Sequence, residues 1–128
     1  MRLLVDTHLV LWAAAKSGRL PKEARRLLQD PANEVLYSAA SLWEIAIKAA
    51  LRRYDFRVDL ALMRPALATM DFMELPVSGA HAEMLTKLPP VHKDPFDRML
   101  VAQSLAEKLV FLTNDASLAA YGQGVKVV

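Results

Sequence analysis

The sequence contains no cysteine and only four glycines in 128 residues. Without cysteine there is no disulfide scaffold, no zinc–thiolate site and no thiol nucleophile. The glycines of the segment 122–124 have the pattern of a turn and lack the spacing of a phosphate-cradling loop. Because thiol-free chains suit a reducing compartment, we expect a cytoplasmic protein.

Long apolar runs are also missing. The run 3–15 is interrupted by Asp6 and His8, and the run 39–51 contains a glutamate and a lysine. Neither run reaches the ~20 apolar residues that a transmembrane helix needs. We therefore expect no membrane span and no targeting segment.

The composition is that of a compact domain, with 54% hydrophobic and 23% charged residues. Sixteen basic residues against fourteen acidic ones give a net charge of +2. If four of the acids gather in one site, the rest of the chain carries an excess of six positive charges. Such a distribution attracts a polyanion while it holds cations at the centre.

Short apolar runs alternate with helical patterns along the whole chain. Strands are predicted at 3–5, 34–37, 72–75, 109–112 and 125–128. Helices are predicted at 9–15, 22–29, from Ser38 or Ser41 to 53, 60–70, 78–88, 95–108 and 116–121. Short, fully apolar strands between helices indicate a parallel sheet covered on both faces. The prediction is one α/β domain over 1–128, with three layers and a central parallel sheet.

Four acidic residues are placed at strand ends or helix starts. Asp6 and Asp115 follow predicted strands, Glu44 comes early in a helix, and Asp97 lies in the first turn of a helix that Asp94 caps. Ligands collect beyond the carboxyl ends of parallel strands, so these acids are expected to converge. Clustered carboxylates need divalent cations to neutralise them, and their hard oxygens favour Mg²⁺ or Mn²⁺ over zinc. A metal held in this way activates water against a phosphodiester.

Each acid also has an ordinary structural interpretation. Asp6 and Asp115 can act as turn or cap residues, and Asp97 can favour a helix N-terminus. Glu44 can pair with Lys48 one turn later, as on any exposed helix face. Their joint occurrence at one predicted sheet edge is what favours a site.

Four segments carry a resemblance to a known family. They read Leu-Leu-Val-Asp-Thr-His at 3–8, Ser-Leu-Trp-Glu-Ile at 41–45, a run from 92 to 103 that begins His-Lys-Asp-Pro-Phe-Asp-Arg, and Leu-Thr-Asn-Asp at 112–115. In this order they resemble the PIN-domain ribonucleases, and most closely the VapC-type toxins of toxin–antitoxin modules. The segment around Asp-Pro-Phe-Asp-Arg is the most specific of the four.

The resemblance implies an endoribonuclease that depends on Mg²⁺ or Mn²⁺, cuts RNA and arrests translation. It also implies a homodimer and a cognate antitoxin protein that blocks the site. The family's catalytic and metal-binding acids fall on Asp6, Glu44, Asp97 and Asp115.

The resemblance further assigns supporting or phosphate-contacting roles to Thr7, Thr113 and Arg98. Asp115 follows Asn114, and we take Asp115 as the residue that faces the site. The three histidines, His8, His81 and His92, have no metal or triad spacing and are interpreted as structural or rim residues.

Two other functions compete with that of a ribonuclease. A haloacid-dehalogenase-like phosphatase needs a second aspartate two residues after the first, where this chain has His8. A catalytically silent PIN-like module that binds RNA or a partner is the stronger rival, although such modules usually lack one of the acids. The apolar stretches 42–51 and 60–70 can host an antitoxin helix, or can equally be core or dimer interface.

Overall fold

The structure is a computed structural model, and it describes residues 1–54 and 57–128. The strands are β1 (Arg2–Val5), β2 (Glu34–Ser38), β3 (Met73–Leu75), β4 (Val110–Thr113) and β5 (Val125–Val127). The helices are α1 (Thr7–Ala14), α2 (Lys22–Gln29), α3 (Ala39–Ala50), α4 (Leu60–Thr69), α5 (Gly79–Leu85), α6 (Pro95–Ala106) and the 3₁₀ helix η1 (Ala116–Tyr121). Within the described ranges, no helix has both the length and the apolar character to cross a membrane.

The five strands form one sheet in the order β3-β2-β1-β4-β5, and every neighbouring pair is parallel. The central strand β1 places Leu4 between Leu36 of β2 and Phe111 of β4. This topology confirms the predicted parallel sheet. It also brings the carboxyl ends of β1, β2 and β4 to one edge, where α1, α3 and η1 begin.

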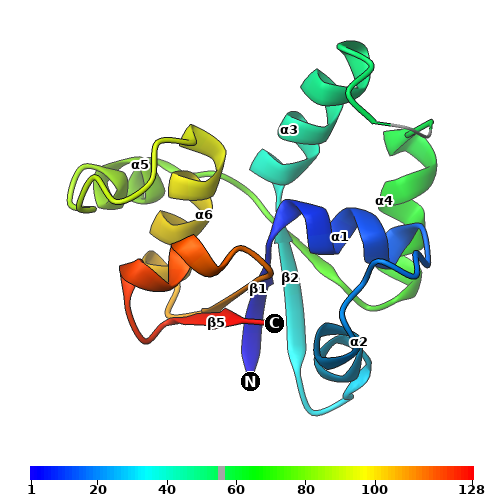
Figure 1. Cartoon of the computed structure of the whole chain (residues 1–128), viewed down its shortest axis with the longest axis horizontal. Helices are drawn as coiled ribbons and strands as arrows, with labels where there is room; N and C mark the ends of the chain where they lie inside the picture. The colour runs from blue at the N-terminus through cyan, green and yellow to red at the C-terminus, as the bar shows by residue number, and fades with distance from the viewer. Residues whose placement is uncertain (55–56) are drawn as a thin grey trace.

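Alternate side chains of β1 enter two separate cores. Leu3 and Val5 pack with residues of α1, α2, α3 and α4, whereas Leu4 packs with α6 and η1. Figure 1 shows α1, α2 and α4 on one side of the sheet and α5 and α6 on the other. The three-layer α/β/α arrangement predicted from the sequence is therefore confirmed.

Side-chain caps fix the helices that start at this edge. The carboxylate of Asp6 accepts a hydrogen bond from the backbone N–H of Thr7, and that of Asp94 accepts one from Phe96. The hydroxyl of Ser38 accepts one from Ala40, so Ser38 rather than Ser41 caps α3. The predicted role of Asp94 is thus confirmed.

The structure corrects two details of the helices. The helix expected to reach residue 88 ends at Leu85 and continues only as turns. The helical spacing of Leu100, Val101, Ser104 and Leu105 predicts that these side chains form the buried stripe of α6, yet Leu105 is 44% exposed. Gln103 is buried instead, because α6 packs against α5, where the Gln103 amide lies 3.3 Å from the ring of His81.

Candidate active site

Asp6 lies directly beyond β1 and is almost fully buried, with 4% of its surface exposed. One carboxylate oxygen accepts the N–H of Thr7 at 2.6 Å, and the other accepts the hydroxyl of Thr113 at 2.5 Å. Burial raises the pKa of Asp6 above its ordinary value, even though both hydrogen bonds lower it. Asp6 is thus a buried acid held in a fixed orientation.

Asp97, in the first turn of α6, has the most perturbed environment. Its pKa is raised from 3.8 to about 7, first by burial and then by the negative charges of Asp6, Asp94, Glu44 and Asp115. Since such repulsion is strong only between nearby charges, the four predicted acids and Asp94 share one neighbourhood.

Glu44 projects from α3 and is 3% exposed. Its Oε2 lies 2.5 Å from the ammonium nitrogen of Lys48, whereas its Oε1 finds no hydrogen-bond partner among the described residues. The predicted Glu44–Lys48 pair does form, but the glutamate side chain is buried. A buried carboxylate oxygen without a donor is an open position for a cation or for a water that a cation holds.

Asp115 caps the helix that follows it, as its ordinary structural interpretation predicts. Its Oδ1 caps η1 by accepting the N–H and the hydroxyl of Ser117 at 3.0 and 2.7 Å, and these bonds lower its pKa. Its Oδ2 lies 3.6 Å from Nε2 of His92. The neighbouring Nδ1 of His92 lies 3.7 Å from Oδ2 of Asp97. The structure therefore inserts a histidine between two of the predicted acids.

Three side chains bring possible metal ligands close together: one atom of each of His92, Asp97 and Asp115 lies within 4.8 Å of the other two. Asp6 and Glu44 are not part of this group. The interpretation of His92 as a structural or rim residue is thus incomplete. Its five-residue separation from Asp97 predicts no contact, because the approach depends on how the loop before α6 folds back. The sequence carried no pattern that marks this contact.

The two predicted threonines are both hydrogen-bonded at this edge of the sheet. Thr113 donates to Asp6 and accepts the N–H of Asp115 at 3.0 Å, so it joins the ends of β1 and β4. Thr7 is buried and donates its hydroxyl to Ser41 on α3 at 2.8 Å. Both hydroxyls are committed to positioning the chain around the acids.

Arg98 contacts the loop before α6, and none of its hydrogen-bond partners in the described part of the chain is a carboxylate. Its guanidinium donates to the carbonyl oxygens of Pro89 and His92 at 3.2 and 3.4 Å and to the hydroxyl of Tyr121 at 3.4 Å. Tyr121 in turn accepts the N–H of His92 at 3.1 Å. Arg98 therefore fixes the loop that carries His92.

The donor set fits a small divalent cation. Asp6, Glu44, Asp97 and Asp115 offer carboxylate oxygens, which are the ligands that Mg²⁺ and Mn²⁺ prefer. The unpartnered Oε1 of Glu44 and the mutual repulsion at Asp97 are both relieved by a positive ion. This arrangement can polarise a phosphodiester and activate a water molecule.

A comparison with family models matches residues 3–123 to the PIN domain. The chain belongs to the PIN domain family. A comparison with curated protein sequences gives no match. The predicted recognition of the family is confirmed, and the four acids of this PIN domain lie on the segments that carried the resemblance.

Solved structures share the PIN fold at low sequence identity. VapBC2 from Rickettsia felis, bound to a DNA fragment from its promoter, has a TM-score of 0.69 and 12% identity over 100% of this chain and 98% of that one. A toxin–antitoxin complex from Klebsiella pneumoniae has a TM-score of 0.65 and 22% identity, with coverages of 98% and 96%. FitAcB from Neisseria gonorrhoeae has a TM-score of 0.60 and 16% identity, with coverages of 96% and 95%.

Proposed function

We propose that this PIN domain is a metal-dependent endoribonuclease, and that it acts in the cytoplasm as the toxin of a toxin–antitoxin module. It hydrolyses RNA phosphodiester bonds and thereby inhibits translation. The observation that carries this proposal is the gathering of acids around the half-buried Asp97, whose pKa is raised to about 7 first by burial and then by their negative charges. Strongly perturbed pKa values cluster at functional sites, which favours an active domain over a silent one.

Within this proposal, Asp6, Asp97 and Asp115 hold Mg²⁺ or Mn²⁺, and Glu44 ligates it directly or orients the attacking water through Oε1. When bound, the cation lowers the pKa of a water and neutralises charge on the phosphoryl oxygens. Thr113 keeps Asp6 in its orientation, and Lys48 fixes the other oxygen of Glu44.

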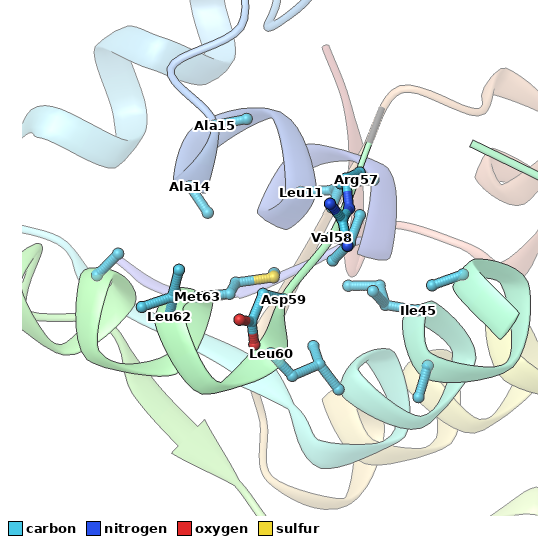
Figure 2. Close-up of a pocket in the computed structure, with 13 residues that line it drawn as sticks. Leu11, Ala14, Ala15, Ile45, Arg57, Val58, Asp59, Leu60, Leu62 and Met63 are labelled. Atoms are coloured by element: carbon cyan, nitrogen blue, oxygen red, sulfur yellow. The ribbon is translucent and has the colours of Figure 1, made fainter. Parts of the chain in front are cut away.

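An apolar groove supports the proposed antitoxin partner. Side chains of α1, α3 and α4 enclose about 970 Å³, and Leu11, Ile45 and Met63 face this space from the three helices. Figure 2 also shows Arg57 and Asp59 among the residues that line it. A helix with an apolar stripe fits such a groove. We assign it to an antitoxin segment because two of the similar structures are a VapBC2 assembly and a toxin–antitoxin complex.

We also propose that the chain forms a homodimer. Three apolar side chains of α3 and its C-cap recur every four residues, which places them on one helix face. They are Trp43, Ile47 and the C-cap residue Leu51, which are 65, 37 and 58% exposed. A self-complementary apolar face of this kind is typical of symmetric dimers. Light scattering should give the mass of two chains for the native protein and the mass of one chain for Leu51→Lys.

Induced expression in growing cells tests the toxin function. We expect the native chain to stop incorporation of labelled methionine, whereas Asp6→Asn and Asp97→Asn produce folded protein without arrest. Arrest by all three chains would favour the silent module, which acts by binding alone. No arrest by the native chain, with the protein present and free of antitoxin, would contradict the proposal.

A further inference from the structure

A second hollow lies between α1 and the end of α3, apart from the apolar groove. It holds about 480 Å³, within the range of about 300–1,000 Å³ that is usual for sites of small ligands. Its lining combines basic side chains with rings, and no carboxylate of the described residues takes part in it. The basic side chains are Arg19, Lys48 and Arg53, and the rings are those of His8, Trp12 and Tyr54. We call this hollow the cationic pocket.

The cationic pocket adjoins the acids of the candidate active site. His8 lies two residues after Asp6, and its charge acts against the rise that burial causes in the pKa of Asp6. Lys48 also reaches both places, since its ammonium nitrogen lies 2.5 Å from Oε2 of Glu44. A polyanion bound in the pocket therefore extends directly to the acids.

The rings of the pocket offer an aromatic surface. Trp12 packs against the core of the domain but is only partly buried, so the indole is held in place and still reachable from the pocket. The ring of His8, one turn earlier on α1, lies 5.8 Å from that of Trp12 at an angle of 47°. Nucleic-acid bases stack on such rings with little regard to sequence. Only an unpaired base has a free face to offer, because in a duplex its neighbours cover both faces.

Arg53 adds a group that recognises phosphate. Its side chain is exposed, and its guanidinium has no ion pair with any of the described residues. A guanidinium binds phosphate oxygens in a two-pronged geometry. Stacking rings beside basic groups, without a carboxylate, match the base and the phosphate of a nucleotide.

We propose that the cationic pocket binds one unpaired nucleotide of the RNA, next to the phosphodiester that the acids cut. The base of this nucleotide stacks on Trp12, and its phosphate contacts Arg53. The inference rests on the proposed function and deepens it, because it makes single-stranded RNA, and not a duplex, the substrate.

Tryptophan fluorescence tests this assignment without cleavage. The chain has two tryptophans, so Trp43→Phe leaves Trp12 as the reporter, and Asp97→Asn in the same chain keeps the RNA intact. A short single-stranded RNA of mixed sequence and the duplex formed with its complement are the two probes. We expect the single strand to quench Trp12 and to bind at least about 10-fold more tightly than the duplex.

Two neighbouring arginines provide a matched pair, measured with a fluorescent label on the single-stranded RNA. Arg53→Gln should weaken binding about 3- to 10-fold and lower the slope of log affinity against log salt concentration by about 0.7. Arg52→Gln removes the same charge one residue earlier, outside the pocket lining, and should change affinity by less than about twofold.

Substitutions of the ring separate stacking from charge. Trp12→Leu should weaken binding of the single strand about 10- to 100-fold, and Trp12→Phe should restore most of it because a phenyl ring also stacks. Thermal melts show that each variant is folded.

The outcomes separate this inference from the proposed function. Equal effects of Arg52→Gln and Arg53→Gln, unquenched Trp12, or equal affinity for strand and duplex would overturn the nucleotide site. Metal-dependent cleavage by the native chain would in those cases leave the nuclease proposal standing. If the native chain neither binds nor cuts RNA, both proposals fail.

Discussion

Replacing Asp97 by asparagine should stabilise the protein when metal is absent. In the folded chain the pKa of Asp97 is raised to about 7, mainly by burial and then by its acidic neighbours, from 3.8 for an unconstrained aspartate. The folded state therefore keeps its proton between these two values while the unfolded state releases it. Because the folded state binds more protons than the unfolded state in this range, wild-type stability falls as the pH rises from about 4 to about 7. Asparagine has no charge to bury and avoids this loss.

The size of the effect follows from the same pKa. Each tenfold change in proton affinity is worth about 1.4 kcal/mol, so the rise to about 7 corresponds to at most roughly 4 kcal/mol. Neighbouring acids share the repulsion and relax when one is removed, so we expect a measured gain of about 1–3 kcal/mol at pH 8. For a domain of this size that is roughly 3–12 °C in melting temperature. At pH 4 the two proteins should melt together.

Thermal melts of both proteins in EDTA, taken from pH 4 to pH 9, measure this difference. A second series with saturating Mn²⁺ should stabilise the wild type by about 2–3 kcal/mol at 100 times the dissociation constant and leave Asp97→Asn unchanged. Destabilisation of the variant at pH 8, or a difference that does not vary with pH, would refute the clustered-acid interpretation.

Four further substitutions test other parts of the structure. Thr113→Val removes a hydrogen bond to the Asp6 carboxylate, so melts should show a loss of about 1.5–3 kcal/mol and the pH–rate profile should move to higher pH. Lys48→Met removes the partner of a buried glutamate and should destabilise the chain by about 1–3 kcal/mol in urea unfolding, part of which a divalent cation restores. On α6, Leu100→Ala should lower the free energy of unfolding by about 2–5 kcal/mol, because Leu100 is buried. Leu105→Ala should change it by less than about 0.5 kcal/mol, because Leu105 is exposed. Equal effects would contradict the placement of the helix.

Most of the fold was predictable because its signals are local. The apolar runs of β1 and β4 are too short for helices and are buried on both faces, as central parallel strands require. Pro95 after Asp94 marks the start of α6 just as clearly. Leu105 was misplaced because its position depends on the angle at which α6 meets α5, which is a tertiary property.

The candidate site was also predictable only where its signals are local. Asp6, Asp97 and Asp115 could be chosen from the sequence, because strand ends and first helical turns are local features that topology brings to one edge. The unpartnered Oε1 of Glu44 and the approach of His92 could not be predicted. Both depend on how loops and helices close over the edge, and no sequence spacing encodes that closure.

Cleavage of total cellular RNA by the purified, antitoxin-free chain tests the central claim most directly. The reactions contain Mg²⁺, Mn²⁺ or EDTA, with Asp97→Asn beside the native chain. We predict discrete fragments that require a divalent cation and are absent both with EDTA and with the variant. Fragments that persist in EDTA or with Asp97→Asn, or intact RNA under every condition, would contradict a metal-dependent ribonuclease.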